Sequence, residues 1–166
     1  MESIPVSEQG FARVYRELER LKKERPEIIQ AIKDAREEGD LSENAGYEAA
    51  RERQAMLEAR INSLESRMAF YNVVKPEQMR GSRIAFGATV RLRDLETDQE
   101  REYTLVGPDE TDFVPKEKHP VSVFSPVGRA LLGRESGDEV VVDVPRGKIF
   151  LEVVDVAFNG PFIKAE

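Results

Sequence analysis

The sequence contains no cysteine and no tryptophan, and it has a single histidine, His119. The absence of cysteine excludes disulfide bonds, thiolate zinc sites and cysteine nucleophiles. One histidine also argues against a histidine-based metal site and against a Ser-His-Asp triad. Any chemistry of this chain therefore has to use carboxylates, hydroxyl groups and cationic side chains.

Long apolar runs are also absent. No stretch approaches the roughly 20 apolar residues that cross a bilayer, and the N-terminus, Met1–Pro5, lacks the basic flank and apolar stretch of a secretion signal. Apolar residues make up 40% of the 166 residues, which is enough for a core. Charged residues make up 34%, and this high fraction indicates long exposed helical faces. We expect a soluble, cytoplasmic protein without a membrane partner.

The first half of the chain has the spacing of a coiled coil. One set of residues alternates steps of three and four, as the a and d positions of a helical seam do: Tyr47, Ala50, Gln54, Leu57, Ile61, Leu64, Met68 and Tyr71. An earlier seam is interrupted by Arg25 and Pro26, where we expect a kink or a local restart of the helix. The short connection between the helices predicts an antiparallel hairpin over residues 1–72, with residues 39–44 at its tip.

Proline, glycine and valine are concentrated after residue 72, and the pattern changes to short strands. Four segments alternate or are apolar and predict a small antiparallel sheet: residues 88–93, 101–106, 139–144 and 149–156. One short helix fits after Ser125, which would be its N-cap. We therefore predict an α+β fold. It consists of the long antiparallel coiled-coil hairpin, a linker at 73–83 and a small globular domain at 84–166, whose tail after Pro161 we expect to be loose.

Asp40 and Glu43 form the candidate site, and two readings of them are open. An Asp-x-x-Glu pair at a helix start is a capping arrangement, in which both carboxylates satisfy backbone amides. Two carboxylates at an isolated tip also suit a hard divalent cation, because Mg²⁺ takes one or two carboxylates and completes its shell with water and phosphate oxygens. Two carboxylates alone bind weakly, so such a tip would supply half of a metal site to a partner.

Four cations surround the predicted tip: Lys33, Arg36, Arg51 and Arg53. They are suited to holding a phosphate backbone, but their spacing from nearby glutamates also suits solvated intrahelical ion pairs. Each half of the chain has a small excess of acid within the net charge of −7, so neither is expected to grip duplex DNA alone. Ser125 is better explained as a helix cap than as a nucleophile, because no base accompanies it.

The segment from Asp40 to Glu52, DLSENAGYEAARE, resembles the tip signature of the bacterial GreA/GreB transcript-cleavage factors. Further matching segments follow in the family's order: Ile4-Pro5, Arg25–Ile29, Phe86–Val90, and Ser125-Pro126 with Ala130–Gly133. The resemblance therefore covers nearly the whole chain.

The resemblance implies that the second domain is FKBP-like and docks on bacterial RNA polymerase, while the coiled coil enters the polymerase's secondary channel. There Asp40 and Glu43 would share a second Mg²⁺ with the polymerase, which cuts nascent RNA whose 3′ end has been extruded by backtracking. Further residues would orient the acids, the RNA or polymerase loops: Asn44, Tyr47, Arg51 and Arg36. The protein would then not be an enzyme by itself, would hold Mg²⁺ only within the complex, and would have no stand-alone sequence-specific DNA binding.

Ser42, Gly46 and Glu48 depart from the family signature, in which lysine, glutamate and histidine are usual at these places. One alternative is a Gre-like channel binder that regulates or inhibits transcription without stimulating cleavage. Another is a coiled-coil adaptor with no link to the polymerase. The presence of both Asp40 and Glu43 favours cleavage over the first alternative, and the second domain counts against the second.

Overall fold

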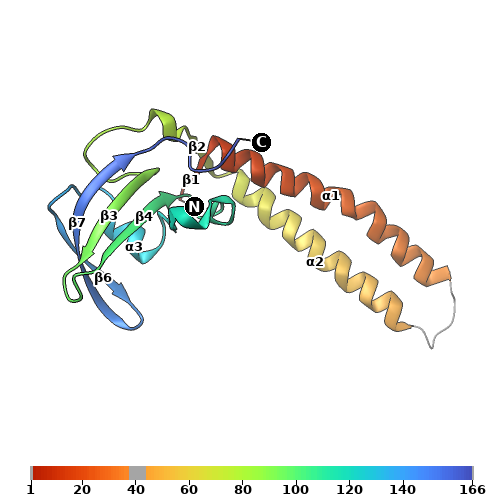
Figure 1. The fold of residues 1–166 in the computed structure, drawn as a ribbon. Helices are drawn as coiled ribbons and strands as arrows, with labels where there is room; N and C mark the ends of the chain where they lie inside the picture. The colour runs from red at the N-terminus through yellow and green to blue at the C-terminus, as the bar shows by residue number, and fades with distance from the viewer. Residues whose placement is uncertain (1, 38–43, 166) are drawn as a thin grey trace. The chain divides into compact units, whose positions relative to one another are not determined.

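The computed structural model describes residues 2–37 and 44–165 (Figure 1). The chain folds into two compact units, one formed by Met1–Arg13 with Tyr71–Glu166 and the other by Val14–Phe70. The first contains a sheet and a short α-helix, and the second is a pair of long helices. The predicted α+β class, a long helical hairpin followed by a small sheet domain, is confirmed.

The two long helices pack through the seam that the spacing predicts. α1 spans Glu8–Glu37, its first turns up to Arg13 belonging to the sheet unit, and α2 spans Asn44–Met68. The buried residues between the helices are Leu18, Leu21, Ile28, Ile32, Leu57 and Ile61. Because these side chains recur every three or four residues, each helix buries one stripe and leaves its charged faces in water.

Polar contacts across the hairpin show that it is antiparallel. Arg25 contacts Glu58, and further along α1 Arg36 contacts Tyr47, nearer the start of α2. The guanidinium of Arg25 donates two hydrogen bonds to the Glu58 carboxylate, at 2.6 and 2.8 Å. This ion pair takes the place of the apolar contact that Arg25 interrupts in the seam. The helix runs on through Pro26 without a break, so the expected local restart is wrong.

A five-stranded sheet with the order β5-β4-β3-β7-β6 forms the body of the other unit. Its strands are β3 (Ala88–Asp94), β4 (Glu100–Val106), β5 (Pro120–Ser122), β6 (Glu139–Val144) and β7 (Gly147–Phe158). The short helices are α3 (Pro126–Leu131) and the 3₁₀ turns η2 (Pro76–Gln78), η3 (Thr111–Phe113) and η4 (Lys116–Lys118). All neighbouring strands are antiparallel except β4 and β5, which are parallel. The predicted strands and the helix after Ser125 are confirmed.

A two-stranded parallel pair holds the start of the chain within the sheet unit. β1 (Ile4–Ser7) pairs with β2 (Tyr71–Val74), and Val6 of β1 is completely buried. The predicted hairpin includes all of residues 1–72, whereas in the structure the first 13 residues lie in the sheet unit. Pairing between strands so distant in sequence leaves no local pattern to detect.

Glu110 is a fully buried carboxylate, 0% exposed. The backbone N–H groups of Ser7 and Gly107 donate to it at 3.1 and 2.9 Å, and the Ser7 hydroxyl donates a further hydrogen bond. The Ser7 hydroxyl oxygen in turn accepts from the N–H of Gly10 at 2.9 Å, in the first turn of α1. One carboxylate thus fastens both β1 and the start of α1 to the loop after β4. Burial raises the pKa of Glu110, and the hydrogen bonds from Ser7 and Gly107 offset part of this rise.

The C-terminal tail packs against the sheet unit. Phe162 and Ile163 are 3% and 2% exposed, and the ring of Phe162 meets Phe86 edge-on with centroids 5.7 Å apart. Arg13 donates a hydrogen bond to the carbonyl of Lys164 at 3.3 Å. The expectation of a loose tail is therefore wrong up to this point, because two apolar residues anchor it in the core.

We expect the stability of the protein to depend on pH through Glu110. Because its pKa is raised in the folded state, the folded protein holds this proton to a higher pH than the unfolded chain does. The free energy of unfolding should therefore fall as the pH rises from about 4, the ordinary range for glutamate, through the raised value. Urea titrations of the wild type and of Glu110→Gln at several pH values measure this. The variant should lose that part of the pH dependence, and equal slopes would contradict the prediction.

Two glycines in α-helices should respond oppositely to alanine. A Cβ at Gly10 would collide with the buried Glu110 carboxylate, whereas a Cβ at Gly46 would meet nothing within 4 Å. Gly10→Ala should lower the free energy of unfolding by about 2 kcal/mol or more, as overpacking does. Gly46→Ala should raise it by about 1 kcal/mol, because alanine is the better helix former. Denaturant titration of both variants checks this, and a stable Gly10→Ala would mean that Glu110 is not fixed where it lies.

Candidate functional site

The connection between α1 and α2 carries the site that the sequence indicates. α1 ends at Glu37 and α2 begins at Asn44. Asp40 and Glu43, the predicted catalytic and metal-binding pair, fall between these helices in the chain and lie outside the described residues, as does the side chain of Asn44. The choice between helix capping and metal binding for the two acids stays a prediction. The described part of the site is the last turn of α1 and the first turns of α2.

Arg36 and Tyr47 face each other across the hairpin beside this connection. The Nη2 of Arg36 donates to the Tyr47 hydroxyl at 3.2 Å, and the guanidinium carbon lies 5.5 Å from the ring centroid. A cation over an aromatic face is attracted by the π electrons. Arg36 also lies in the last turn of α1, where the helix dipole favours a positive charge. The side chain of Tyr47 also packs against the buried residues of the seam. The packing of the two helices therefore places its ring opposite Arg36.

The charges around Tyr47 change its acidity. The hydrogen bond from Arg36 lowers the pKa of the Tyr47 phenol, and the positive charges of Arg36 and Arg51 act in the same direction. The structure therefore brings three of the predicted site residues together, with the phenol as an acceptor between two cations. A guanidinium has five N–H donors, and Tyr47 takes one of those of Arg36. Both arginines are exposed, and among the described residues the printed hydrogen bond of Arg36 is the one to Tyr47.

Lys33 and Arg53, the other two cations of the predicted tip, are exposed side chains. Within the described parts of the two helices neither makes an ion pair. The alternative to phosphate binding was that these cations form ion pairs with glutamates of the same helix. For Lys33 and Arg53 the described parts of the helices do not show such pairs.

Residues 2–37 and 44–165 contain no group of three or more acidic or histidine side chains that would hold a metal ion. Asp40 and Glu43 supply hard oxygen donors of the kind that Mg²⁺ prefers, but only two of them. The donor set therefore fits a magnesium ion that takes its remaining ligands from elsewhere.

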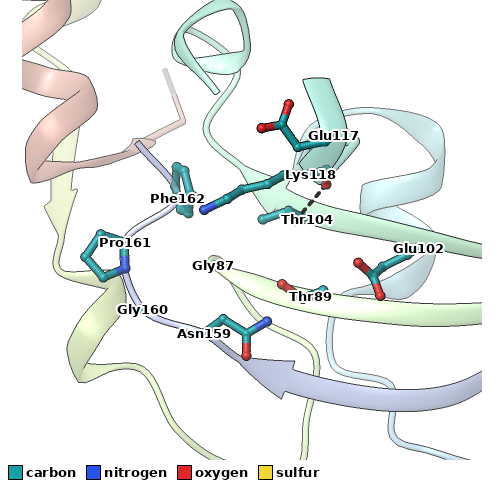
Figure 2. A pocket seen from close by; sticks show the side chains of 10 residues that line it. All are labelled: Gly87, Thr89, Glu102, Thr104, Glu117, Lys118, Asn159, Gly160, Pro161 and Phe162. Atoms are coloured by element: carbon teal, nitrogen blue, oxygen red, sulfur yellow. Dashed lines mark hydrogen bonds between the residues drawn. The ribbon is translucent and has the colours of Figure 1, made fainter. Parts of the chain in front are cut away.

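A second candidate is a polar cleft of about 230 Å³ in the sheet unit, where β3, β4, η4 and the segment 159–162 meet (Figure 2). Its lining consists of Gly87, Thr89, Glu102, Thr104, Glu117, Lys118, Asn159, Gly160, Pro161 and Phe162. The Thr104 hydroxyl donates to the carbonyl of Lys118 at 2.8 Å and is thereby occupied. The walls of the cleft come from four separate segments, so no local pattern in the sequence predicts it.

Ser125 is a helix cap, as predicted. Its hydroxyl oxygen accepts from the N–H of Gly128 at 3.1 Å, and its proton is donated to the carbonyl of Ser122 at 2.7 Å. Both functions of the hydroxyl are used within the turn, so Ser125 is not placed as a nucleophile. His119 is exposed.

None of the helices in the described part of the chain has the length and apolar character needed to span a membrane.

Two family models match this chain. Residues 4–73 match the N-terminal domain of transcription elongation factors, described as GreA_GreB_N, and residues 79–158 match the C-terminal domain of GreA/GreB. Together they cover most of the chain, including both units.

Individual relatives are similar over nearly the whole length. A protein of Nitratidesulfovibrio vulgaris named transcription elongation factor GreA is 61% identical over 160 residues, covering 96% of each chain. One of the same name from Solidesulfovibrio magneticus is 60% identical over 166 residues, covering 100% of this chain and 99% of its own. Among solved structures, the GreA factor homolog Gfh1 of Thermus thermophilus is 29% identical, with a TM-score of 0.44, over 94% of this chain and 99% of its own.

The contact between Arg36 and Tyr47 predicts an unusual titration of one tyrosine. Tyr47 should ionise at a lower pH than ordinary tyrosines, whose pKa is about 10, and Arg36→Met should move its pKa back upwards because the main hydrogen-bond donor is lost. NMR titration of the tyrosine ring signals measures both values. Arg53→Met removes an equal charge from the exposed face of α2 and should leave the pKa of Tyr47 nearly unchanged. An identical titration in wild type and Arg36→Met would contradict the assignment.

Proposed function

Because the chain belongs to the GreA/GreB family of transcription elongation factors, we propose that it binds RNA polymerase and stimulates the polymerase's own cleavage of backtracked nascent RNA. The observation that carries this proposal is the 61% identity over 96% of both chains to a protein named GreA. Cleavage of the backtracked RNA creates a new RNA 3′ end. The proposed activity would therefore rescue arrested complexes. A partner of this kind implies a cytoplasmic protein.

The two units have different tasks in this proposal. The sheet unit docks on the outside of the polymerase, and the helical hairpin enters the secondary channel toward the active centre. A helix of 30 residues such as α1 is about 45 Å long, which suits it to reach a buried site. The apolar seam between α1 and α2 supports entry into a channel, because it holds the two helices together along the hairpin.

Asp40 and Glu43 would hold a magnesium ion together with ligands of the polymerase. When bound, such a second ion supplies activation of water and stabilisation of the charge that develops on the scissile phosphate. The chain contributes only the two carboxylates, so it is not expected to cut RNA alone.

Arg36 and Arg51 would bind phosphate oxygens of the RNA or acidic groups of the polymerase near these carboxylates. The hydrogen bond between Arg36 and Tyr47 supports this role, because it orients an exposed guanidinium beside the connection and uses one of its five N–H donors. Tyr47 is then a positioning residue, and Asn44 at the start of α2 would assist in the same place.

Regulation without cleavage is the less favoured function. The relatives named GreA are 60% and 61% identical to this chain over nearly its whole length. The chain also keeps both acids, Asp40 and Glu43.

The proposal predicts a loss of RNA cleavage when the acids are neutralised. In a backtracked bacterial polymerase complex the wild type should shorten the RNA from its 3′ end, and Asp40→Asn with Glu43→Gln should do so at least about a hundredfold more slowly, since a catalytic metal supplies several kcal/mol. Glu48→Gln, which removes a neighbouring carboxylate of α2, is the matched control and should remain active. Binding to the polymerase is measured in parallel and should be unchanged in both variants.

Two outcomes would overturn parts of this proposal. A wild type that binds the polymerase and leaves the RNA intact would be a regulatory binder, and Asp40 and Glu43 would then be capping residues. Cleavage of free RNA by the protein and Mg²⁺ alone, abolished by Asp40→Asn, would show a stand-alone nuclease.

A further inference from the structure

The first half of β4 is an open edge of the sheet. β4 pairs with β3 along residues 89–93 on one side, but its other neighbour, β5, pairs only with Thr104, Leu105 and Val106. Within the described residues nothing pairs with the stretch 100–103 on that side. An unpaired row of backbone N–H and C=O groups is a template for a further strand.

The direction of the backbone groups follows from the bonds that β4 makes to its neighbour. The N–H of Thr104 donates to the carbonyl of His119 at 3.2 Å, and the carbonyl of Val106 accepts from the N–H of Val123 at 2.9 Å. Backbone groups of alternate residues point to the same side of a strand. The N–H and C=O groups of Glu100 and Glu102 therefore point to the open edge.

The turn at His119 is the reason that β5 does not cover this edge. His119 adopts a left-handed conformation with φ of 47°, which turns the chain from η4 into β5. The strand therefore begins at Pro120, beside Thr104, and leaves the preceding residues of β4 without a neighbouring strand among the described residues.

A groove of about 480 Å³ runs beside the open edge. It is lined by Glu100, Arg101, Glu102, Tyr103, Glu117 and His119. The groove lies next to the polar cleft, which shares Glu102 from β4 and Glu117 from η4 with it (Figure 2). An extended segment at the edge would thus find space for side chains in the groove.

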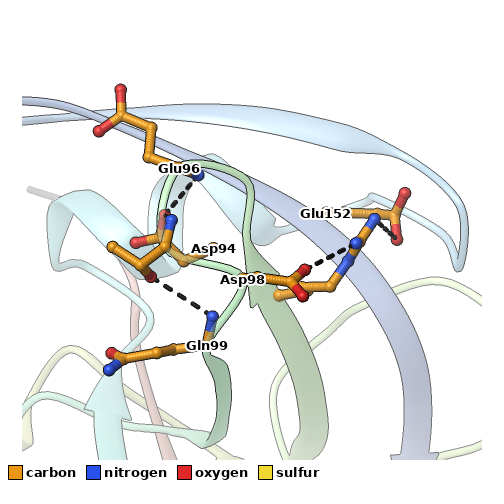
Figure 3. A network of polar contacts seen from close by, with 7 residues as sticks. Asp94, Glu96, Asp98, Gln99 and Glu152 are labelled. Carbon is orange, nitrogen blue, oxygen red and sulfur yellow. Dashed lines mark hydrogen bonds and ion pairs between the residues drawn. The ribbon is translucent and has the colours of Figure 1, made fainter.

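The groove is acidic, because the nearby arginines are already paired. Arg93 forms ion pairs with Asp98 at 2.9 Å and with Glu152 at 3.2 Å, and these two carboxylates are labelled in Figure 3. Arg101 lies 3.5 Å from the carboxylate of Asp94.

Three carboxylates of the groove have no such partner among the described residues: Glu100, Glu102 and Glu117. Arg91 lies opposite Glu102 in the β3–β4 register without forming an ion pair there.

We propose that the open edge of β4 binds an extended segment of a partner protein, which adds to the sheet as a strand beside residues 100–103 and carries lysine or arginine at alternate positions. The backbone groups of Glu100 and Glu102 bind its main chain, and their carboxylates with that of Glu117 bind its basic side chains. A second copy of this chain does not fit, because two such edges would bring like charges together. This site is additional to the proposed function and does not depend on it.

A synthetic peptide tests this with the full-length, ¹⁵N-labelled protein. The probe is the hexapeptide Lys-Val-Lys-Val-Lys-Thr with blocked ends, and its matched control is Lys-Lys-Lys-Val-Val-Thr, which has the same composition without alternation. Saturation with the probe should slow amide exchange of Glu100 and Glu102 at least about tenfold by adding hydrogen bonds. The control peptide should bind more weakly and give no such protection.

Two variants separate the main chain from the charge. Glu102→Pro is compared with Glu102→Gln, which lacks the same carboxylate but keeps the edge N–H, and it should bind about fivefold to tenfold more weakly than Glu102→Gln does. Glu100→Lys with Glu102→Lys leaves the backbone unchanged and should abolish binding of the basic peptide. Glu139→Lys with Asp143→Lys, on the far strand β6, makes the same change of charge and should bind as the wild type does. Thermal melting shows that each variant is folded.

Three results would overturn the proposal. They are no binding of the probe at millimolar concentration, binding without protection of Glu100 and Glu102, and protection that rises with protein concentration in the absence of peptide. The last would make a second copy of the chain the occupant of the edge.

Discussion

The buried carboxylate of Glu110 fixes the start of the chain to the sheet unit. It accepts hydrogen bonds from Ser7 and Gly107, and through the Ser7 hydroxyl it holds the first turn of α1. The close approach is possible because Gly10 and Gly107 have no Cβ, and a Cβ at either position would collide with this carboxylate or its surroundings. The pairing of β1 with β2 and the beginning of α1 within the sheet unit rest on this one buried group, whose desolvation raises its pKa.

The helical hairpin is held differently, since its seam is mainly apolar and polar side chains cross it at intervals. Arg25 and Glu58 form a bidentate pair across the seam, and Arg36 and Tyr47 form the last described contact before the connection. Both contacts hold a guanidinium in a defined plane. In the proposed function the second contact matters most, because it presents cationic N–H groups next to the segment that carries Asp40 and Glu43. If Asp40 and Glu43 hold magnesium as proposed, two carboxylates alone bind it weakly, which suits a protein that completes another molecule's active centre.

The two candidate binding sites of the sheet unit, the polar cleft and the open edge of β4, lie at its edges rather than in its core. The core is filled by side chains from the strands and by Phe162 and Ile163 of the tail. The polar cleft and the open edge of β4 lie where strands end and loops cross. Charge decides which partner such an edge accepts: unpaired carboxylates repel another copy of the same edge and attract a basic strand.

Local patterns in the sequence were sufficient for the parts of the fold that repeat. The spacing from Tyr47 to Tyr71 predicts the seam, because side chains on one helical face recur every three or four residues. The residues after Ser125 predict a capped helix. The tip signature identified the site residues, of which Arg36 and Tyr47 are seen in contact.

Only the tertiary structure decided which distant segments meet: β1 with β2, Phe162 with Phe86, and Glu110 with Ser7. It also decided that η4 and His119 leave the edge of β4 open. Periodicity reports which face of a segment is buried, but the partner on that face is chosen by packing and hydrogen bonding among residues that are far apart in the chain.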